Sequence, residues 1–176
     1  MMGPVCWTLT LPILLSASQE ELPAGWVKYA LPEGRYSVAM PATPTKSVKK
    51  ITTATAQLDA VVAVAEGRLD SFFVVSYCDY PARELKADSI DKRLDQGAKA
   101  AVENARGKLR SEKPIKLDGH PGREIVIEKD GEVIAKMRIY LVDRRLYQVM
   151  VLGSGPIFAV KEKDVGIFLD SFRLNK

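Results

Sequence analysis

The residue types that most often carry catalysis are scarce in this 176-residue sequence. Its one histidine, His120, lies within the turn-rich segment Asp118–Gly122, and Cys78 directly follows the apolar run Phe72–Tyr77. A cysteine nucleophile and its histidine base must lie within hydrogen-bond reach of each other, and the spacing of these two residues gives no indication of such a pair. We therefore expect His120 in a surface turn and Cys78 as a small buried side chain.

Acidic residues offer a second kind of chemistry. Asp88, Asp91 and Asp95 follow one another at helical spacings of three and four, which could gather carboxylate oxygens around a hard cation. Lys92 and Arg93 would compete for the same oxygens, and the helix dipole already explains acids at a helix amino terminus. Zinc needs three or four cysteine, histidine or carboxylate ligands. We predict no metal site.

Serine and glycine motifs do not indicate a reaction centre either. Ser154 lies in Gly153–Pro156, but the Gly-x-Ser-x-Gly spacing of a nucleophile elbow is absent and no second histidine exists to serve it. The glycines match neither a phosphate-binding loop nor a dinucleotide-binding fingerprint. We predict a loop at 153–156, no catalytic, cofactor-binding or metal-binding residue, and no enzymatic activity.

The composition is that of a globular domain, with 47% hydrophobic and 27% charged residues. The 26 basic and 22 acidic side chains leave a formal charge of +4, and acids are interleaved with bases. Nucleic-acid binding requires basic residues gathered on one face. The nearest basic run is Lys46, Lys49 and Lys50, which an edge strand protected by lysine also explains. We expect no nucleic-acid partner.

The first 18 residues contain no charged side chain, unlike the rest of the chain. Their apolar part, Val5–Leu15, is shorter than the roughly 20 residues that a bilayer-spanning helix needs. Ser16 and Ser18 occupy the −3 and −1 positions of a cleavage site after residue 18, where signal peptidase accepts small residues. We predict a signal peptide over 1–18, export to the periplasm or the extracellular space, and a single mature domain over 19–176 without a transmembrane segment. The alternative is an uncleaved tail.

The elements that must position these residues follow from hydrophobic periodicity. Prolines and turn residues separate several extended segments in the first half of the chain. We predict strands over 26–29 and 36–40, a hairpin or long bent strand over 47–65, and a strand over 72–77. The continuous apolar run in the last of these is typical of a central strand covered on both faces.

One long amphipathic helix is predicted next. Asp88 can cap it, and Pro114 prevents its continuation. The apolar stripe, which must pack on a sheet, comprises Ile90, Leu94, Ala98, Ala101, Ala105 and Leu109. The opposite face is basic and carries Lys92, Arg93, Lys99, Arg106, Lys108 and Arg110.

A three-stranded meander over 123–129, 132–142 and 145–152 is the clearest pattern. The pairs Asp130-Gly131 and Asp143-Arg144 are its expected turns, the first suited to a type I′ hairpin. In the middle strand we expect Val133, Ala135, Met137, Ile139 and Leu141 on a dry face and Lys136, Arg138 and Tyr140 on a wetter face. A terminal helix around 161–170 is expected to cover the remaining apolar surface with Val165, Phe168, Leu169 and Phe172.

Four segments, in this order, resemble the PsbP/Mog1-like superfamily, especially its small exported bacterial proteins of unknown role. They are Tyr36–Pro41 with Pro44, the turn Asp118–Glu124, Arg145–Val149 and Phe168–Leu174. The resemblance implies an α+β fold, an α-β-α sandwich around a mostly antiparallel sheet. Named relatives act on photosystem II or on the Ran GTPase as accessory or partner-binding proteins, and no functional residue carries over from them.

Three hypotheses for the function follow. The first is an exported non-enzymatic domain that binds a protein partner or assists assembly. The second is a small-ligand carrier or sensor with a groove between the long helix and the sheet, which a closed apolar pocket would favour and flat packing would oppose. The third, a hydrolase, ranks last because it requires a catalytic trio of which the sequence gives no sign.

Overall fold

The computed structural model describes residues 22–52, 57–82 and 90–175, which form two antiparallel sheets and three helices. The strands are β1 (Val27–Leu31), β2 (Tyr36–Met40), β3 (Thr45–Thr52), β4 (Gln57–Glu66), β5 (Phe72–Asp79), β6 (Lys108–Leu117), β7 (His120–Lys129), β8 (Glu132–Val142), β9 (Arg145–Leu152) and β10 (Arg173–Leu174). The helices are α1 (Ile90–Ala105), α2 (Gly155–Val160) and α3 (Glu162–Ser171).

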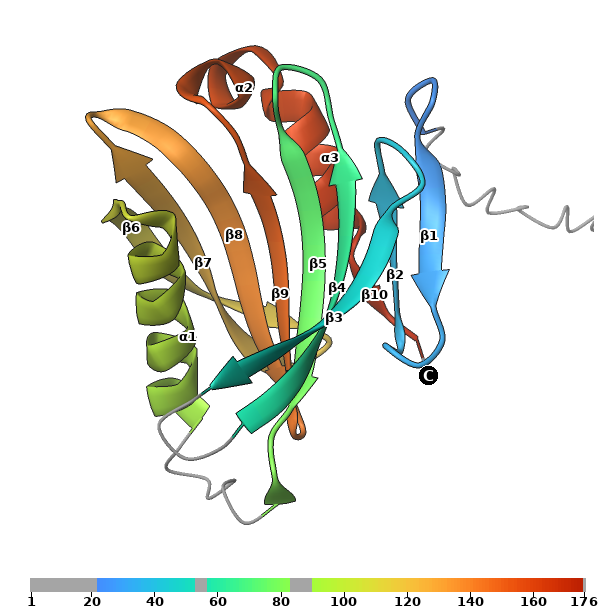
Figure 1. Cartoon of the computed structure of the whole chain (residues 1–176), viewed down its shortest axis with the longest axis vertical. Coiled ribbons are helices and arrows are strands. Elements are labelled where there is room, and N and C mark those ends of the chain that lie inside the picture. Colours follow the sequence, from blue (N-terminus) through green and yellow to red (C-terminus); the bar gives the residue numbers. More distant parts are fainter. Residues whose placement is uncertain (1–21, 53–56, 83–89, 176) are drawn as a thin grey trace, which may run out of the picture.

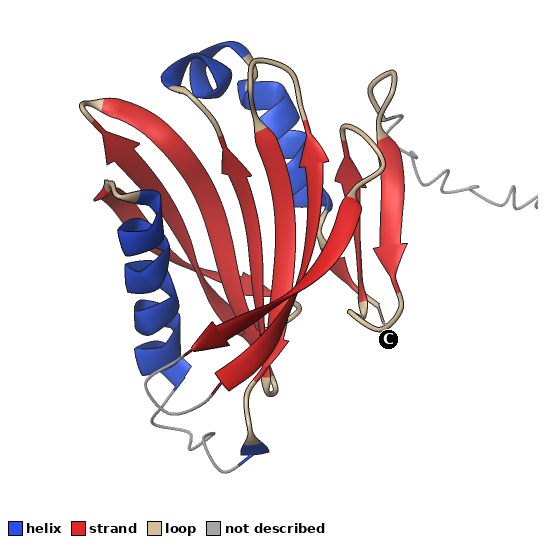
Figure 2. Ribbon diagram, in the orientation of Figure 1, coloured by secondary structure: helices blue, strands red, loops and turns tan. Residues whose placement is uncertain are grey.

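The larger sheet has seven strands in the order β3-β4-β5-β9-β8-β7-β6, and the smaller has three in the order β1-β2-β10. Figure 1 shows α1 on one face of the larger sheet and α3 behind its other face, where the small sheet also lies. The helices in Figure 2 thus form outer layers around the strands. This arrangement confirms the α+β prediction of an α-β-α sandwich around an antiparallel sheet.

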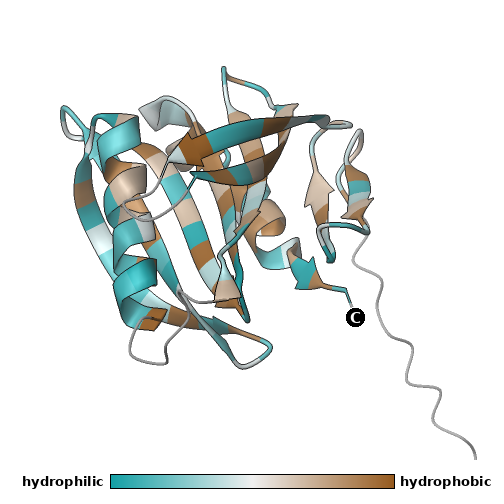
Figure 3. Cartoon of the chain, turned by 60° about the horizontal axis from the view of Figure 1, so that its bottom comes forward, coloured by the Kyte–Doolittle hydropathy of each residue, from teal (hydrophilic) through white to brown (hydrophobic). Residues whose placement is uncertain are grey.

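Two apolar cores fill the spaces on either side of the larger sheet. Beneath α1, Leu94 and Ala98 pack against β7 and β8, and a Cβ at Gly97 would make an ordinary van der Waals contact, 3.6 Å from Ile139. On the other side, Phe168 and Phe172 pack into a cluster of aromatic residues from both sheets. Several strands alternate between hydrophilic and hydrophobic residues along their length (Figure 3), because neighbouring side chains point to opposite faces.

The predicted continuation of the long helix to residue 110 is wrong. Helix α1 ends at Ala105, where Arg106 takes a positive φ of 51°. The amides of Arg106 and Gly107 donate to the carbonyls of Glu103 and Val102, which is the hydrogen-bond pattern of a Schellman cap. A side chain at Gly107 would clash, since its Cβ would lie 2.7 Å from the Glu128 carbonyl oxygen.

The residues after this cap form β6, a strand that the sequence did not predict. Leu109 extends the helical stripe by coincidence of spacing, but in β6 it pairs with Ile127 and is 46% exposed. Pro114 also belongs to β6, opposite Arg123. The sheet tolerates this proline because β6 is its terminal strand.

The expected hairpin turns between the later strands are confirmed. Asp118 and Gly119, which join β6 to β7, have φ of 49° and 85°. Asp130 and Gly131, between β7 and β8, have φ of 53° and 85°. Both pairs show the two positive φ values that a type I′ turn requires. In the turn between β8 and β9, Asp143 has a positive φ but Arg144 does not.

One face assignment in the meander needs correction. Ala135, together with Met137, Ile139 and Leu141, faces α1 as predicted. Val133 does not face α1. In the pairing of β7 with β8, Ile127 lies opposite Ala135 and Glu128 lies opposite Val133, so one residue of β8 is skipped. The extra residue, Ile134, is a β-bulge, and it turns Val133 to the opposite face.

The C-terminal region holds the predicted helix and an additional one. Helix α3 buries Val165, Phe168 and Leu169 as expected. The predicted loop at 153–156 is partly wrong, because α2 begins at Gly155. Pro156 in the first turn of α2 suits a helix start, where no backbone donor is needed.

Two further expectations from the first half are refined. The segment 47–65 is a hairpin of β3 and β4, whose connection at 53–56 lies outside the described residues. Strands β1 and β2 do not join the larger sheet but form the small sheet with β10.

Truncation in the α1-side core should be costly. Leu94 is 0% exposed, so Leu94→Ala should lower the free energy of unfolding by about 2–5 kcal/mol through lost burial and a cavity. Leu109→Ala, at an exposed position, should change it by less than about 1 kcal/mol. Urea denaturation measures both, and equal effects would contradict the packing of α1 on the sheet.

Candidate functional site

Cys78 lies on β5 beneath α1 and is 6% exposed. Its pairing neighbours are Ala60 on β4 and Leu146 on β9, both buried. Burial, with a smaller contribution from the Asp79 carboxylate, raises the pKa of the Cys78 thiol to about 11. A thiol in this environment is protonated at neutral pH and is a poor nucleophile.

His120 is the first residue of β7, beside the turn that the sequence predicted, and it is partly buried. Three strand spacings separate β7 from the strand that carries Cys78. At about 4.8 Å per spacing, this places the two residues roughly 14 Å apart across the sheet. The structure therefore does not bring His120 and Cys78 together.

The acids at the start of α1 surround an arginine. Arg123 Nη2 donates to Asp91 Oδ1 at 2.9 Å and to Asp95 Oδ1 at 3.4 Å, and its Nε lies 3.1 Å from Glu112 Oε1. Its guanidinium thus occupies the position between these carboxylates that a cation would take. Asp88 lies outside the described residues, and among those described no cluster of three metal-ligating side chains occurs.

Ser154 stands at the residue before α2, with extended backbone angles. Its hydroxyl makes no capping hydrogen bond, while its carbonyl accepts from the amide of Ile157. The position is that of a helix start and shows no strained nucleophile turn of the kind that α/β-hydrolases use.

Two other arginines join separate layers of the fold. Arg138 donates to Glu124 Oε2 at 2.7 Å and to the Leu169 carbonyl at 2.9 Å, and it lies 2.8 Å from Asp170 Oδ1. It therefore attaches the end of α3 to the meander. Despite its partial burial, Glu124 has a lowered pKa because Lys113 and Arg138 donate to its carboxylate.

Arg145 makes a similar connection at the other end of the sheet. Its guanidinium donates to both oxygens of Asp79 at 2.7 Å and to the Glu33 carbonyl at 2.8 Å, and it lies 4.3 Å from the centre of the Tyr77 ring. Tyr147 adds a hydrogen bond of 2.7 Å to the Gly34 carbonyl. The charges of these residues are thereby used to hold the layers together.

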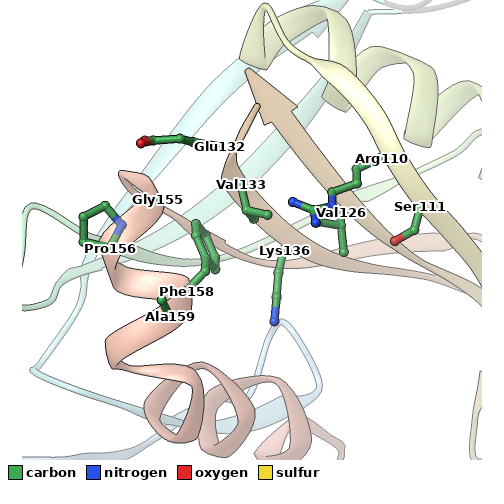
Figure 4. Close-up of a pocket in the computed structure, with 10 residues that line it drawn as sticks. All are labelled: Arg110, Ser111, Val126, Glu132, Val133, Lys136, Gly155, Pro156, Phe158 and Ala159. Carbon is green, nitrogen blue, oxygen red and sulfur yellow. The ribbon is translucent and has the colours of Figure 1, made fainter. Parts of the chain in front are cut away.

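An open groove of about 690 Å³ lies beside α2. Figure 4 shows Phe158 and Pro156 on its α2 side and Arg110 and Ser111 on its β6 side, with Val133 between them. The other lining residues are Val126, Glu132, Lys136, Gly155 and Ala159. Neither this groove nor a second cavity, of about 270 Å³ beside Trp26, is lined by α1. The groove therefore lies across the sheet from the position that the sequence suggested.

Two charged side chains that line this groove, Lys136 and Glu132, have no ion pair among the described residues. Lys136 is half-buried and has no ion pair among the described residues, whereas Arg110 lies 3.8 Å from Glu128 Oε2. A cation beside the apolar ring of Phe158 could attract the anionic group of an amphiphilic molecule.

The most exposed element of the larger sheet is β3. All eight of its residues are exposed, and Val48 is 62% exposed. Strand β3 pairs with β4 on one side, and no described strand pairs with its other side. The backbone groups along this outer edge thus have no partner among the described strands and can pair with another extended chain, a feature that only the tertiary arrangement reveals.

Comparisons with known proteins bear on the fold. No family model matches the chain, and a search of curated proteins found no match. Among solved structures, the solution structure of cyanobacterial PsbP (CyanoP) from Synechocystis sp. PCC 6803 is similar, with a TM-score of 0.58 and 13% sequence identity over 91% of this chain and 98% of that chain. The chain has a PsbP-like fold. This confirms the resemblance noted in the sequence as far as the fold is concerned. No helix in the described residues is long and apolar enough to cross a membrane.

The Asp79–Arg145 pair should make stability depend on pH. Hydrogen bonding from Arg145 lowers the pKa of Asp79 from its usual 3.8, so the pair stabilises the fold above that pH and its contribution is lost as pH falls through the lowered pKa. At pH 7, Asp79→Asn should lower the free energy of unfolding by about 1 kcal/mol, since the carboxylate is half-exposed. Denaturation at a series of pH values should show the difference from wild type shrinking below pH 3.8, and a constant difference would contradict this role.

Proposed function

We propose that this chain is an exported, non-enzymatic domain that binds a protein partner through β3. Residues 1–18 are its signal peptide, and the mature domain is 19–176. The observation that carries the proposal is the uncovered edge of β3, where all eight side chains are exposed and the outer backbone groups have no described partner.

The distribution of charge supports a binding role over a catalytic one. Arg123, Arg138 and Arg145 are each held by carboxylates from other elements. Cys78 is buried with a raised pKa, and His120 is separated from it by two intervening strands. Cys78 and these arginines are thus committed to the interior or to ion pairs, whereas β3 is left uncovered.

A photocrosslinking experiment in the native host tests the proposal. A photoreactive residue at Val48 should capture one partner protein in stoichiometric yield, because this side chain is exposed on the proposed surface. The matched control is the same residue at Leu109, also exposed but on the opposite edge of the sheet. Sequencing the mature amino terminus in the same sample should find residue 19 first. No capture at 48, or the same proteins captured at 48 and 109, would contradict the binding role.

A second candidate function has support from the groove beside α2. Lys136, which lines the groove with Phe158 and has no ion pair in the described part of the chain, favours a small amphiphilic anion as the ligand. This is the carrier hypothesis, moved from the α1 side to the α2 side of the sheet.

Native mass spectrometry of the protein purified from its host distinguishes this candidate. If the groove carries such a ligand, the protein should retain an added mass that Lys136→Glu abolishes, because charge reversal repels the anion. The matched control, Lys116→Glu on the exposed surface of β6, should leave the mass in place. Retention of no ligand by the wild-type protein would contradict the carrier role.

A further inference from the structure

We propose that β3 binds its partner by strand addition, and that the bound segment is extended and acidic. The segment would lie beside β3 as an eighth strand of the larger sheet. This inference rests on the proposed binding role of β3 and adds the geometry and the chemical class of the partner.

The backbone of β3 is a regular template. Its eight residues pair with β4 from Thr45 to Thr52 without a register shift, and none of them is proline. In an antiparallel ladder, every second residue directs its amide and carbonyl groups away from the existing partner. A partner strand can therefore form a continuous set of main-chain hydrogen bonds along this edge.

The opposite edge of the same sheet is built differently. Strand β6 contains Pro114, which has no amide donor, and its pairing with β7 is interrupted by a bulge at Arg110. Prolines and bulges disrupt the backbone template itself, whereas the lysines of β3 oppose strand addition only through their charge, which an acidic strand would neutralise. The chain thus protects one edge of its seven-stranded sheet by these means and leaves the other regular.

The side chains of β3 indicate what the added strand carries. Lys46 and Lys50 already have acidic partners in this chain, Glu33 at 2.7 Å and Asp59 at 3.0 Å. Lys49 has no ion pair among the described residues. An acidic residue of the partner beside Lys49 would supply the missing opposite charge, at a distance where cross-strand pairs are favourable.

The two faces of β3 differ, which gives the partner segment a pattern. Val48 pairs with Val61, while Lys49 pairs with Ala60 and so points to the other face. Val48 shares its face with Lys46 and Lys50, which already have acidic partners, and Lys49 shares the other face with Ile51. A complementary strand therefore places an apolar residue beside Val48 and an acidic residue on the opposite face beside Lys49.

Charge also opposes a second copy of this chain as the natural occupant. Antiparallel pairing of two β3 strands would bring together three lysines from each copy, Lys46, Lys49 and Lys50. Like charges across strands are destabilising, so the lysines that oppose self-association favour an acidic segment of another protein.

An NMR titration of the isotopically labelled chain, in the form its host produces, tests the inference. The probe is a synthetic ten-residue peptide of alternating valine and glutamate. Its binding should shift the backbone amide signals of β3, and leave those of β6 unchanged. A valine and lysine peptide of the same length, and the acidic peptide with N-methyl groups on alternate residues, should bind at least about tenfold more weakly. The valine and lysine peptide carries the same charge as β3, and the N-methylated peptide lacks main-chain amide donors at alternate residues.

Two charge reversals provide the matched comparison within the protein. Lys49→Glu should weaken binding of the acidic peptide about tenfold, whereas Lys116→Glu, an equal change of net charge on exposed β6, should leave it unchanged. Both sites are exposed, so folding should be retained, which the unchanged amide spectrum outside the mutated strand verifies.

Each contrary result has a defined meaning. Absence of β3 shifts, equal binding of the two charge patterns, or insensitivity to N-methylation would overturn strand addition by an acidic segment. Shifts of β3 that depend on protein concentration without peptide would show self-association instead. If Val48 still captures a partner in the crosslinking experiment, the binding role of β3 survives these failures; if it captures none, the proposed function itself fails.

Discussion

The seven-stranded sheet has two apolar faces, and both must be shielded from water for the chain to fold. The central strands β5 and β9 contain three fully buried valines, Val75, Val149 and Val151, because the covering layer packs against them. Helix α1 supplies one cover, and α3 with the small sheet supplies the other. Burial of these faces provides the main stabilisation, and it explains why the two apolar clusters lie on opposite sides of one sheet.

This double covering also determines where the charges are placed. Arg123 connects the meander to α1, Arg138 connects it to α3, and Arg145 connects the larger sheet to the loop before β2. A partly buried cation needs such partners, since an unpaired charge away from water is costly. The result is a set of ion pairs and hydrogen bonds that connect the layers, in place of a group of reactive side chains.

The covers do not reach the ends of the sheet. Helix α1 packs on β7 and β8, and the aromatic core lies under α3, while all eight residues of β3 remain exposed. The two terminal strands differ in backbone regularity. Strand β6 contains a proline and a bulge, whereas β3 pairs with β4 without interruption. A lysine-rich edge strand, which the sequence offered only as an explanation for a basic run, becomes the surface on which the binding proposal rests.

Local patterns in the sequence determined most of the elements and the type of fold. Alternation in β8, the Asp-Gly turns and the stripe of α3 follow from period and turn chemistry, which depend on neighbouring residues. Strand β6 was not predicted because Leu109 continues the apolar stripe of α1 by chance. Gly107 was the one residue nearby that indicated the end of the helix. Tertiary structure alone decided the bulge that turns Val133, the separation of the small sheet, the position of the groove and the exposure of β3. Those features depend on which distant strands pair and which layers cover them, and no local sequence pattern carries that information.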